Sequence, residues 1–371
     1  MKKRLLYFVT EDWYFCSHRQ PLAEAALEAG FEVSVVTRVR RHGDTIRRSG
    51  LRLIPFEISR QGINPLSESR VIARLAKLYR RVRPDIVHHV ALKPVLYGAL
   101  AARLAGVEHV ISALAGMGWL FTASSKKAEM LMPVVSFALA RMLSRGQTIV
   151  QNQDDAALIQ KMGVRKEKIV LIPGSGVDTT VFRPQPEPHG VPLVILHSRM
   201  LRDKGVREFV EAARLLRQRG KAVRFILLGR PDPANPASIP QGKLNAWHRS
   251  GEVEWWGERT DIPEVLGQAH VVCLPSYREG LPKSLLEGAA SGRPIVTTDV
   301  PGCRDVVADG DNGFLVPARQ AGALADAIER LLGDAALRQR MGRRGRERVE
   351  NEFSLNRVIA DTMDLYRRVL T

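Results

Sequence analysis

The stretch Val271-Val-Cys-Leu-Pro-Ser-Tyr-Arg-Glu279-Gly-Leu-Pro-Lys-Ser-Leu-Leu-Glu287-Gly-Ala-Ala290 changes from an apolar run to a helical period. Its first residues, Val271–Leu274, have the length and composition of a buried strand, and Glu279-Gly280 marks a turn. Pro282 suits the first position of a helix, where its missing amide hydrogen would have no partner in any case. A strand, a turn and a helix in direct succession form the repeating unit of a parallel α/β sheet.

The same unit recurs in both directions along the chain. In the first part, with a first helix expected at Pro21–Ala29, the predicted strands are Leu5–Thr10, Glu32–Thr37, Leu51–Pro55, Asp85–His89, Val107–Ala113, Thr148–Gln151 and Ile169–Ile172. In the second part they are Leu193–His197, Val223–Leu228, Val253–Trp256, Val271–Leu274, Ile295–Thr298 and Gly313–Val316. The sequence therefore predicts an α/β protein with two Rossmann-like, doubly wound domains.

A proline-rich polar segment at 183–192, Arg-Pro-Gln-Pro-Glu-Pro-His-Gly-Val-Pro, is typical of a linker. The 371 residues suffice for two domains of ordinary size. We place the first domain at 1–185 and the second at 190–352, and we expect an amphipathic helix within 353–371 to pack back on the first. Ligands of such sheets bind beyond the carboxyl ends of the strands, which predicts chemistry in a cleft between the domains.

Composition narrows the class of protein. The three cysteines are far apart and form no zinc-like cluster, which favours a reducing compartment and predicts no metal site. The N-terminal apolar run is too short for a signal peptide, and no uncharged stretch is long enough to span a bilayer. A formal net charge of +17 indicates an anionic partner, either phospholipid headgroups or nucleic acid, or plain solubility. We expect a cytoplasmic protein.

The turn and helix at 279–287 predict a phosphate site. The free amides of Leu281, Lys283 and Ser284 at the helix start, together with the helix dipole, suit an anion. Glu279 precedes the helix and Glu287 lies further into it, so that one carboxylate lies beside the phosphate end of a ligand and the other reaches a ribose. The alternative is that both glutamates are solvated helix charges.

A second motif, His197-Ser-Arg199-Met-Leu-Arg-Asp-Lys204-Gly205, directly follows a predicted strand. Arg199 can offer a bidentate fork and Lys204 a point charge to a diphosphate. A nucleoside diphosphate that leaves during a reaction needs such neutralisation. The alternative is a solvated basic turn.

Three histidines and a lysine are candidates for the acceptor side of a reaction. We place His18 at the end of the first strand, facing the cleft, and His88 and His89 at the end of another, so that strand alternation turns one of this pair inward. Each histidine is interpreted either as a phosphate or acceptor ligand or as a structural side chain with its hydrogen bonds satisfied. Lys93 is a candidate contact of an acceptor diphosphate.

Two segments could lie against a membrane. The stretch 118–137 mixes Trp119 and Phe121 with Lys126 and Lys127, and a basic amphipathic helix is predicted near 68–83. The cations of that helix are Arg70, Arg74, Lys77, Arg80, Arg81 and Arg83. Core helices with a solvated face would show the same spacing.

Taken together, Arg199…Lys204-Gly205 and Glu279-Gly280-Leu281-Pro282…Glu287 resemble the retaining GT-B glycosyltransferases of family 4. The resemblance implies that Arg199 and Lys204 hold the donor diphosphate, Glu279 the sugar and Glu287 the ribose. It implies a donor site of Arg199, Lys204, Glu279, Gly280, Leu281, Pro282, Lys283, Ser284 and Glu287, with Arg199, Lys204 and Glu279 catalytic.

The first half resembles a narrower branch of that family. Ser17-His18-Arg19-Gln-Pro21 and His88-His89-Val-Ala-Leu-Lys93-Pro94 are similar to enzymes that extend polyprenyl-diphosphate-linked glycans, in the branch of the N-acetylgalactosaminyltransferase of bacterial protein glycosylation. This implies a UDP-sugar donor, an N-acetylhexosamine as the sugar, a lipid-linked glycan acceptor, and work at the inner face of the cell membrane. It also implies retention of configuration without a metal or other cofactor.

Other functions fit the residues less well. No GxxxxGK[ST] or GxGxxG fingerprint follows a strand, which disfavours kinases and dehydrogenases. A nucleotide-sugar epimerase of the same fold, or a non-catalytic basic protein that binds membrane or nucleic acid, are the alternatives. The aromatic share of 6% disfavours nucleic acid, so we expect no nucleic-acid partner.

Overall fold

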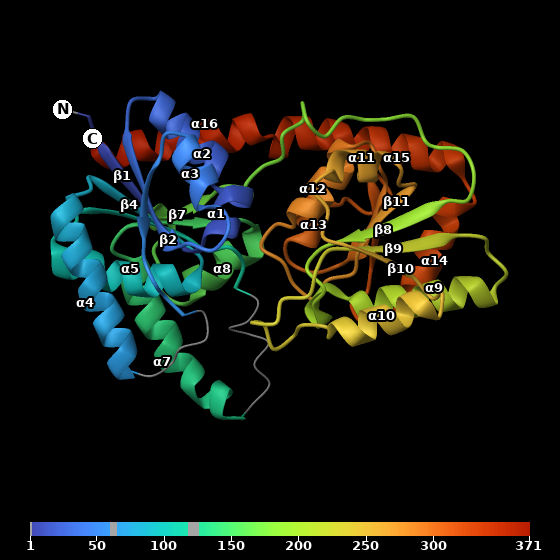
Figure 1. The fold of residues 1–371 in the computed structure, drawn as a ribbon, viewed down its shortest axis with the longest axis horizontal. Helices are drawn as coiled ribbons and strands as arrows, with labels where there is room; N and C mark the ends of the chain where they lie inside the picture. The colour runs from blue at the N-terminus through green and yellow to red at the C-terminus, as the bar shows by residue number, and fades with distance from the viewer. Residues whose placement is uncertain (1, 60–64, 118–125) are drawn as a thin grey trace. The chain divides into compact units, whose positions relative to one another are not determined.

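The computed structural model describes residues 2–59, 65–117 and 126–371. The chain folds into two compact units, each built around a parallel sheet (Figure 1). The first unit comprises Met1–Ser175 together with Arg357–Thr371, and the second comprises Gly176–Asn356. The α/β class and the two Rossmann-like domains predicted from the sequence are confirmed.

The sheet of the first unit has the strand order β3-β2-β1-β4-β5-β6-β7. Its strands are β1 (Arg4–Glu11), β2 (Glu32–Arg38), β3 (Arg52–Pro55), β4 (Ile86–Val90), β5 (His109–Ala113), β6 (Gln147–Val150) and β7 (Ile169–Leu171). Its helices are α1 (Asp12–His18), α2 (Gln20–Glu28), α3 (Gly43–Arg48), α4 (Pro65–Val82), α5 (Leu92–Ala105), α7 (Lys126–Leu143), α8 (Gln153–Lys161), the 3-10 turn η1 (Lys166–Lys168) and most of α16 (Leu355–Leu370).

The central strand β1 shows why this sheet is covered on both faces. Leu5 and Tyr7 pack into one hydrophobic cluster, and Leu6 and Phe8 pack into another, so alternate residues are buried on opposite faces. The first cluster includes Tyr366 of α16, whose hydroxyl lies 2.7 Å from that of Tyr7. The C-terminal helix is therefore part of the core of the first unit.

The structure has one helix before those that the sequence predicts. The helix predicted at Pro21–Ala29 is confirmed as α2 (Gln20–Glu28), but α1 at Asp12–His18, directly after β1, was not predicted. Asp12 is fully buried, and its Oδ2 accepts the amides of Arg40, Arg41 and His42 at 2.6–2.9 Å. This long-range bonding fixes the start of α1, and no local pattern in the sequence reveals it.

The sheet of the second unit has the strand order β10-β9-β8-β11-β12-β13. Its strands are β8 (Leu193–His197), β9 (Arg224–Leu228), β10 (Glu254–Gly257), β11 (Val271–Leu274), β12 (Ile295–Thr298) and β13 (Gly313–Val316). Its helices are η2 (Arg202–Lys204), α9 (Val206–Gln218), α10 (Gln241–Arg249), α11 (Ile262–Gly267), α12 (Lys283–Ala290), α13 (Cys303–Val306), α14 (Ala321–Leu332), α15 (Ala335–Arg348) and η3 (Val349–Phe353).

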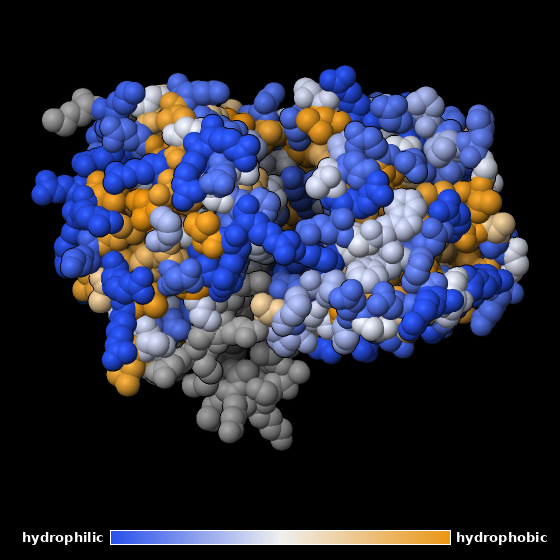
Figure 2. Space-filling model, in the orientation of Figure 1, coloured by the Kyte–Doolittle hydropathy of each residue, from blue (hydrophilic) through white to orange (hydrophobic). Residues whose placement is uncertain are grey.

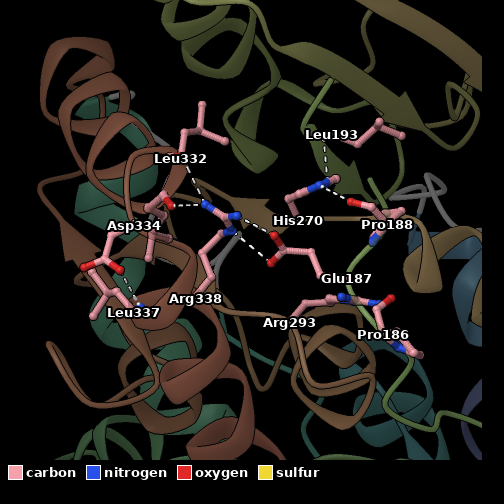
Figure 3. A network of polar contacts seen from close by, with 11 residues as sticks. Pro186, Glu187, Pro188, Leu193, His270, Arg293, Leu332, Asp334, Leu337 and Arg338 are labelled. Carbon is pink, nitrogen blue, oxygen red and sulfur yellow. Dashed lines mark hydrogen bonds and ion pairs between the residues drawn. The ribbon is translucent and has the colours of Figure 1, made fainter. Parts of the chain in front are cut away.

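The segment that we interpreted as a linker lies within the second unit, and Figure 3 shows what holds it there. The guanidinium of the buried Arg338 binds the carboxylate of Glu187, with Nε at 2.9 Å from Oε2. Arg293 Nη2 donates to the carbonyl of Gln185 at 3.0 Å.

A histidine holds the end of the same segment. His270 accepts a hydrogen bond from the amide of Leu193 on its Nδ1 atom. The hydrogen of the ring is therefore on Nε2, which donates to the carbonyl of Pro188 at 3.0 Å. These bonds explain why a proline-rich segment is fixed.

Helix α4 buries its apolar face and presents its cations outward. Leu75, Tyr79 and Val82 are buried in the core of the first unit. The six cations named above are all exposed, although Arg74 lies over the ring of Phe56. In Figure 2 the visible face of this helix is mainly hydrophilic, with an apolar tip at its lower end. The helix is thus a core helix with a basic solvated face.

The other segment considered for the membrane is only partly described. Residues 118–125, with Trp119 and Phe121, lie outside the described residues. Within α7, Val135 and Phe137 are exposed. Among the described residues, no helix is both long and apolar enough to cross a bilayer.

Candidate donor site in the second unit

The predicted donor residues gather at one edge of the second sheet. The chain runs outward from β8 to β10, returns to the other side of β8 as β11, and continues to β13. The strand order thus reverses between β8 and β11, which pair in parallel with Val271 opposite Val194. In open α/β sheets, ligands bind beyond the carboxyl ends of the strands at such a switch point.

Glycine lets the loops after β8 and β11 approach each other. Gly205 has a φ of +70°, and a Cβ there would lie 2.1 Å from the carbonyl oxygen of Pro275. Any other residue would therefore push the two loops apart. The approach brings the ammonium of Lys204 into contact with the carboxylate of Glu279. Ser276 donates its hydroxyl to the same carboxylate oxygen at 2.6 Å.

A third loop, which follows β12, also contacts the turn that contains Glu279. The amide of Glu279 donates to the carbonyl of Pro301 at 3.1 Å. Gly302 has a φ of +82°, and a Cβ there would lie 2.6 Å from the carbonyl of Gly280. The turn Glu279-Gly280 is therefore held by contacts on both sides, which fixes the start of the following helix.

Arg199 is paired within the same edge of the sheet. Its Nη1 lies 2.8 Å from Oδ2 of Asp232, a residue that follows β9. The side chain of Arg199 is 39% exposed, whereas that of Asp232 is 13% exposed. Both predicted phosphate-binding cations thus have a carboxylate partner and remain within reach of solvent, so an incoming diphosphate can compete for them.

Helix α12 begins where the sequence predicts an anion site. Pro282 is the residue before the helix, and its carbonyl accepts the amides of Leu285 and Leu286. The earlier amides of a helix have no intrahelical acceptor, and its dipole favours negative charge at that end. Gly280, Leu281 and Pro282 are buried, whereas Lys283 and Ser284 are half-buried.

Glu287 is a buried carboxylate with a basic side chain within ion-pair distance of each oxygen. Lys283 Nζ lies 3.5 Å from its Oε1, and His197 Nδ1 lies 3.4 Å from its Oε2. Burial by itself would raise the pKa of Glu287, but His197 and Lys283 outweigh it and hold the pKa below its ordinary value. Glu287 is therefore ionised at neutral pH and can accept hydrogen bonds from hydroxyls.

Three side chains of this arrangement were not among the predicted site residues: His197, Asp232 and Ser276. His197 stands at the carboxyl end of β8, and this position, which the sequence predicts, was a signal that could have identified it. Ser276 lies three residues before Glu279, as in many turns, and Asp232 follows a different strand. Only the pairing of β8 with β9 and β11 brings Asp232 and Ser276 to the cations.

The predicted acceptor-side residues all lie in the first unit, around the reversal of its strand order between β1 and β4. His88 and His89, in β4, are fully buried. His88 Nδ1 lies 2.6 Å from the hydroxyl of Tyr366, and His89 Nε2 lies 3.1 Å from that of Tyr79. Burial lowers the pKa of both rings, that of His89 to about 3. Both rings point into the core, one on each face of the sheet.

His18 and Lys93 are nearer the surface. The prediction that His18 ends the first strand is wrong, because helix α1 follows β1 and His18 is its last residue. Its ring stacks on Tyr14 with ring centroids 4.2 Å apart, and its Nδ1 lies 2.6 Å from Ser17 Oγ. Lys93, in the first turn of α5, donates to the carbonyl of Ser59 at 2.6 Å and pairs with Glu68 at 3.1 Å. Both follow strands at the reversal, which is where the first unit would bind a ligand.

The comparisons with known proteins agree with this architecture. The family model "Glycosyl transferases group 1" matches residues 191–334, and "Glycosyl transferase 4-like" matches residues 4–153. The chain is 29% identical to the N,N'-diacetylbacillosaminyl-diphospho-undecaprenol alpha-1,3-N-acetylgalactosaminyltransferase of Campylobacter jejuni over 95% of each chain. It is 26% identical to the UDP-Gal:alpha-D-GlcNAc-diphosphoundecaprenol alpha-1,3-galactosyltransferase of Escherichia coli, over 82% of this chain and 81% of that one.

A third relative and two solved structures extend the comparison. The alpha-maltose-1-phosphate synthase of Mycolicibacterium smegmatis is 31% identical over 76% of this chain and 79% of its own. The sucrose-phosphate synthase of Thermosynechococcus elongatus superposes with a TM-score of 0.82 at 20% identity over 99% of both chains. Anabaena HepE, solved in complex with UDP-glucose, superposes with a TM-score of 0.77 at 17% identity over 97% of this chain and 99% of that one.

Two doubly wound units, with paired cations and a helix start at a switch point, define a protein of the GT-B class. The chain belongs to the group 1 glycosyltransferases of family 4, and it is therefore an enzyme.

Proposed function

We propose that this enzyme transfers a sugar, an N-acetylhexosamine, from a UDP-sugar to a polyprenyl-diphosphate-linked glycan in the assembly of a cell-surface polysaccharide or glycoprotein. The observation that carries the proposal is the ion-paired cluster of Lys204 and Glu279 beside the start of α12. Support for the acceptor comes from the relatives of Campylobacter jejuni and Escherichia coli, whose names specify undecaprenol-linked diphosphates.

The donor diphosphate binds between Arg199, Lys204 and the first amides of α12. Arg199 contributes a fork that matches phosphate oxygens, and Lys204 contributes a point charge. Glu287 accepts from the ribose hydroxyls, and Glu279 accepts from the sugar. Support for UDP comes from the solved HepE complex with UDP-glucose and from the UDP-Gal named for the Escherichia coli relative.

The reaction proceeds on one face of the sugar. The bond between the anomeric carbon and the diphosphate oxygen breaks, and the acceptor hydroxyl oxygen bonds to that carbon from the same side. The acceptor proton passes to the departing diphosphate. Arg199, Lys204 and the helix dipole neutralise the charge that develops on the diphosphate, so the protein itself supplies the stabilisation that a metal would otherwise give. The sugar keeps its anomeric configuration.

The acceptor is held by the first unit. His18 at the end of α1 and Lys93 at the start of α5 contact the acceptor diphosphate, and the buried His88 and His89 support β4. The basic face of α4 attracts the anionic inner surface of the cell membrane, where a polyprenyl acceptor is anchored. Such attraction is worth about 1 kcal/mol per cation near the surface.

A transfer assay tests the proposal. The purified chain would be given each of a panel of UDP- and GDP-sugars with a polyprenyl-diphosphate disaccharide, and the products would be separated by mass. Transfer from one UDP-N-acetylhexosamine, with no change of the donor when the acceptor is left out, is the expected result. Conversion of the donor to its epimer without acceptor would instead establish an epimerase, and transfer to a lipid-free sugar alone would refute the proposed acceptor.

A further inference from the structure

His197 lies beside Glu287 in the candidate donor site, and the proposed function assigns it no role there. It is the last residue of β8, and its side chain is 23% exposed. Its Nδ1 atom is buried and lies 3.4 Å from Oε2 of Glu287, whose side chain is 8% exposed. Among the described residues, Nδ1 has no hydrogen-bond partner, and its contact with this oxygen has the distance of an ion pair. The ring thus directs one nitrogen at Glu287.

The carboxylate of Glu287 can rotate about its terminal bond unless a neighbouring group holds each of its oxygens. It lies in the second turn of α12, where Lys283 Nζ lies 3.5 Å from its Oε1 atom. A carboxylate that accepts from two adjacent hydroxyls must keep its plane fixed, or one of the two hydrogen bonds is lost. His197 approaches the opposite oxygen from a different element, so Lys283 and His197 together fix the rotation of the carboxylate.

We propose that His197 is a positioning residue that holds Glu287 through Nδ1 and thereby makes the donor site select ribonucleotides over 2′-deoxyribonucleotides. The proposal rests on the proposed function, in which Glu287 accepts from the ribose. His197 touches neither the sugar nor the diphosphate in this scheme. Its effect appears in recognition of the 2′-hydroxyl, and a residue that only packed the strand would not change that recognition.

The test is a titration by calorimetry with UDP and 2′-deoxy-UDP, and in parallel with GDP and 2′-deoxy-GDP. A hydrogen bond to a charged group is worth about 1.5–3 kcal/mol, so the wild-type chain should prefer the ribonucleotide by roughly ten- to a hundredfold. His197→Ala should reduce this preference to about threefold or less, mainly by weakening the ribonucleotide, since a mobile carboxylate keeps only part of that bond.

Two further variants separate positioning from packing. In His197→Asn the side-chain amide occupies the place of Nδ1 and should retain most of the preference, whereas in His197→Gln it occupies the place of Nε2 and should not. His189→Ala, at an exposed histidine of the same unit, is the matched control and should leave the preference unchanged. Melting temperatures identify variants that fail to fold. If His197→Ala fails to fold, the comparison of His197→Asn with His197→Gln tests the role of Nδ1 instead.

The outcomes distinguish the two proposals. Binding of a nucleoside diphosphate with an undiminished ribose preference in His197→Ala, or equal loss in the Asn and Gln variants, overturns the role of His197 alone. Absence of binding to either UDP or GDP in the wild-type chain overturns the proposed function and this inference with it.

Discussion

At the scale of single residues, each cation of the candidate donor site has a carboxylate partner. Lys204 contacts Glu279 and Arg199 contacts Asp232, so each cation lies beside a carboxylate of lower exposure. Such pairing fixes the long side chains in place, which reduces the entropy that they lose when a ligand binds. A diphosphate offers more acceptor oxygens than one carboxylate, and it can take over the guanidinium and the ammonium together.

Replacement of Arg199 tests this arrangement. We expect Arg199→Ala to lower kcat/KM for the donor by roughly 10²–10³-fold, the usual cost of one lost contact to developing negative charge. Arg199→Lys should recover only part of the rate, because a single ammonium lacks the planar fork. The measurement is initial-rate kinetics with varied donor.

A matched control is available on α10. Arg249 is exposed at the end of that helix, and Arg249→Ala should leave the kinetics unchanged. Near-normal turnover of Arg199→Ala would remove Arg199 from the site.

The buried histidines of β4 make stability depend on pH. The pKa of His89 is lowered from 6.5 to about 3 by burial, and that of His88 is lowered well below 6.5 by burial and the nearby Arg19 charge. Below pH 6.5 the unfolded chain binds protons that the folded chain does not, so acidification favours unfolding. We expect the free energy of unfolding to fall by about 1.4 kcal/mol per pH unit for each ring.

Urea denaturation at several pH values between about 7.5 and 5 measures this slope. His89→Gln places an amide near the position of Nε2, which faces Tyr79, and does not titrate, so its slope should be shallower by one ring's contribution. An unchanged slope in this variant would show that other groups cause the acid sensitivity.

At the scale of elements, α5 packs against β4 through a missing side chain. A Cβ at Gly98 would lie 2.4 Å from Nε2 of His89, so this helix approaches the strand only because residue 98 is glycine. Helix α4 differs from α5 in having an exposed face. Its apolar face is buried in the core, and its basic face is exposed to solvent.

Two glycine substitutions should therefore act in opposite directions. Gly98→Ala forces the His89 ring from its place and should reduce the free energy of unfolding by about 1–3 kcal/mol. At Gly242, in α10, an added Cβ would meet no heavy atom of the described residues within 4 Å apart from its chain neighbours and its own helix backbone. Gly242→Ala should therefore raise that free energy by roughly 0.5–1 kcal/mol. Urea denaturation compares them, and stabilisation by Gly98→Ala would contradict the close packing.

The basic face of α4 should determine membrane binding. We expect the triple charge reversal Arg70→Glu, Lys77→Glu and Arg81→Glu to weaken binding to vesicles with anionic lipid by well over tenfold, from about 1 kcal/mol per cation. Sedimentation with vesicles of phosphatidylglycerol and phosphatidylcholine measures the effect.

The control for α4 reverses Arg249, Arg340 and Arg343 of the second unit, which are also exposed. This control changes the net charge by the same amount and should bind vesicles nearly as well as the wild type. Equal loss in both triple variants would mean that net charge, and not α4, drives binding.

At the scale of the whole molecule, the two units repeat one topological feature. In each sheet the strand order reverses beside the first strand, between β1 and β4 and between β8 and β11. The predicted donor residues follow the strands of the second reversal, and His18 and Lys93 follow those of the first. The proposed function therefore assigns one ligand-binding edge to each of the two substrates.

Complete turnover tests the chemistry assigned to the whole chain. With charge neutralised by Arg199, Lys204 and α12, we expect transfer rates to be unchanged by EDTA. The anomeric configuration of the product, read from proton coupling constants, should equal that of the donor. Loss of activity in EDTA, restored by a divalent cation, would require a metal in the mechanism.

The sequence by itself determined the layered architecture and the donor motifs. Short apolar runs and helical periods are local patterns, and a glycine or proline marks the turn between them, so β11, the Glu279-Gly280 turn and α12 were all predictable. The resemblance to family 4 rested on the same local residues, and the comparisons confirmed it.

Only the tertiary structure decided which side chains meet. Asp232 reaches Arg199, Lys204 reaches Glu279 and His197 reaches Glu287 because strands that are far apart in the sequence lie side by side in the sheet. The start of α1 and the attachment of segment 183–192 depend on equally distant partners, and so does the burial of both histidines of β4. Spacing along a chain carries no record of these contacts, because strand order and packing bring them about only once the sheet has formed.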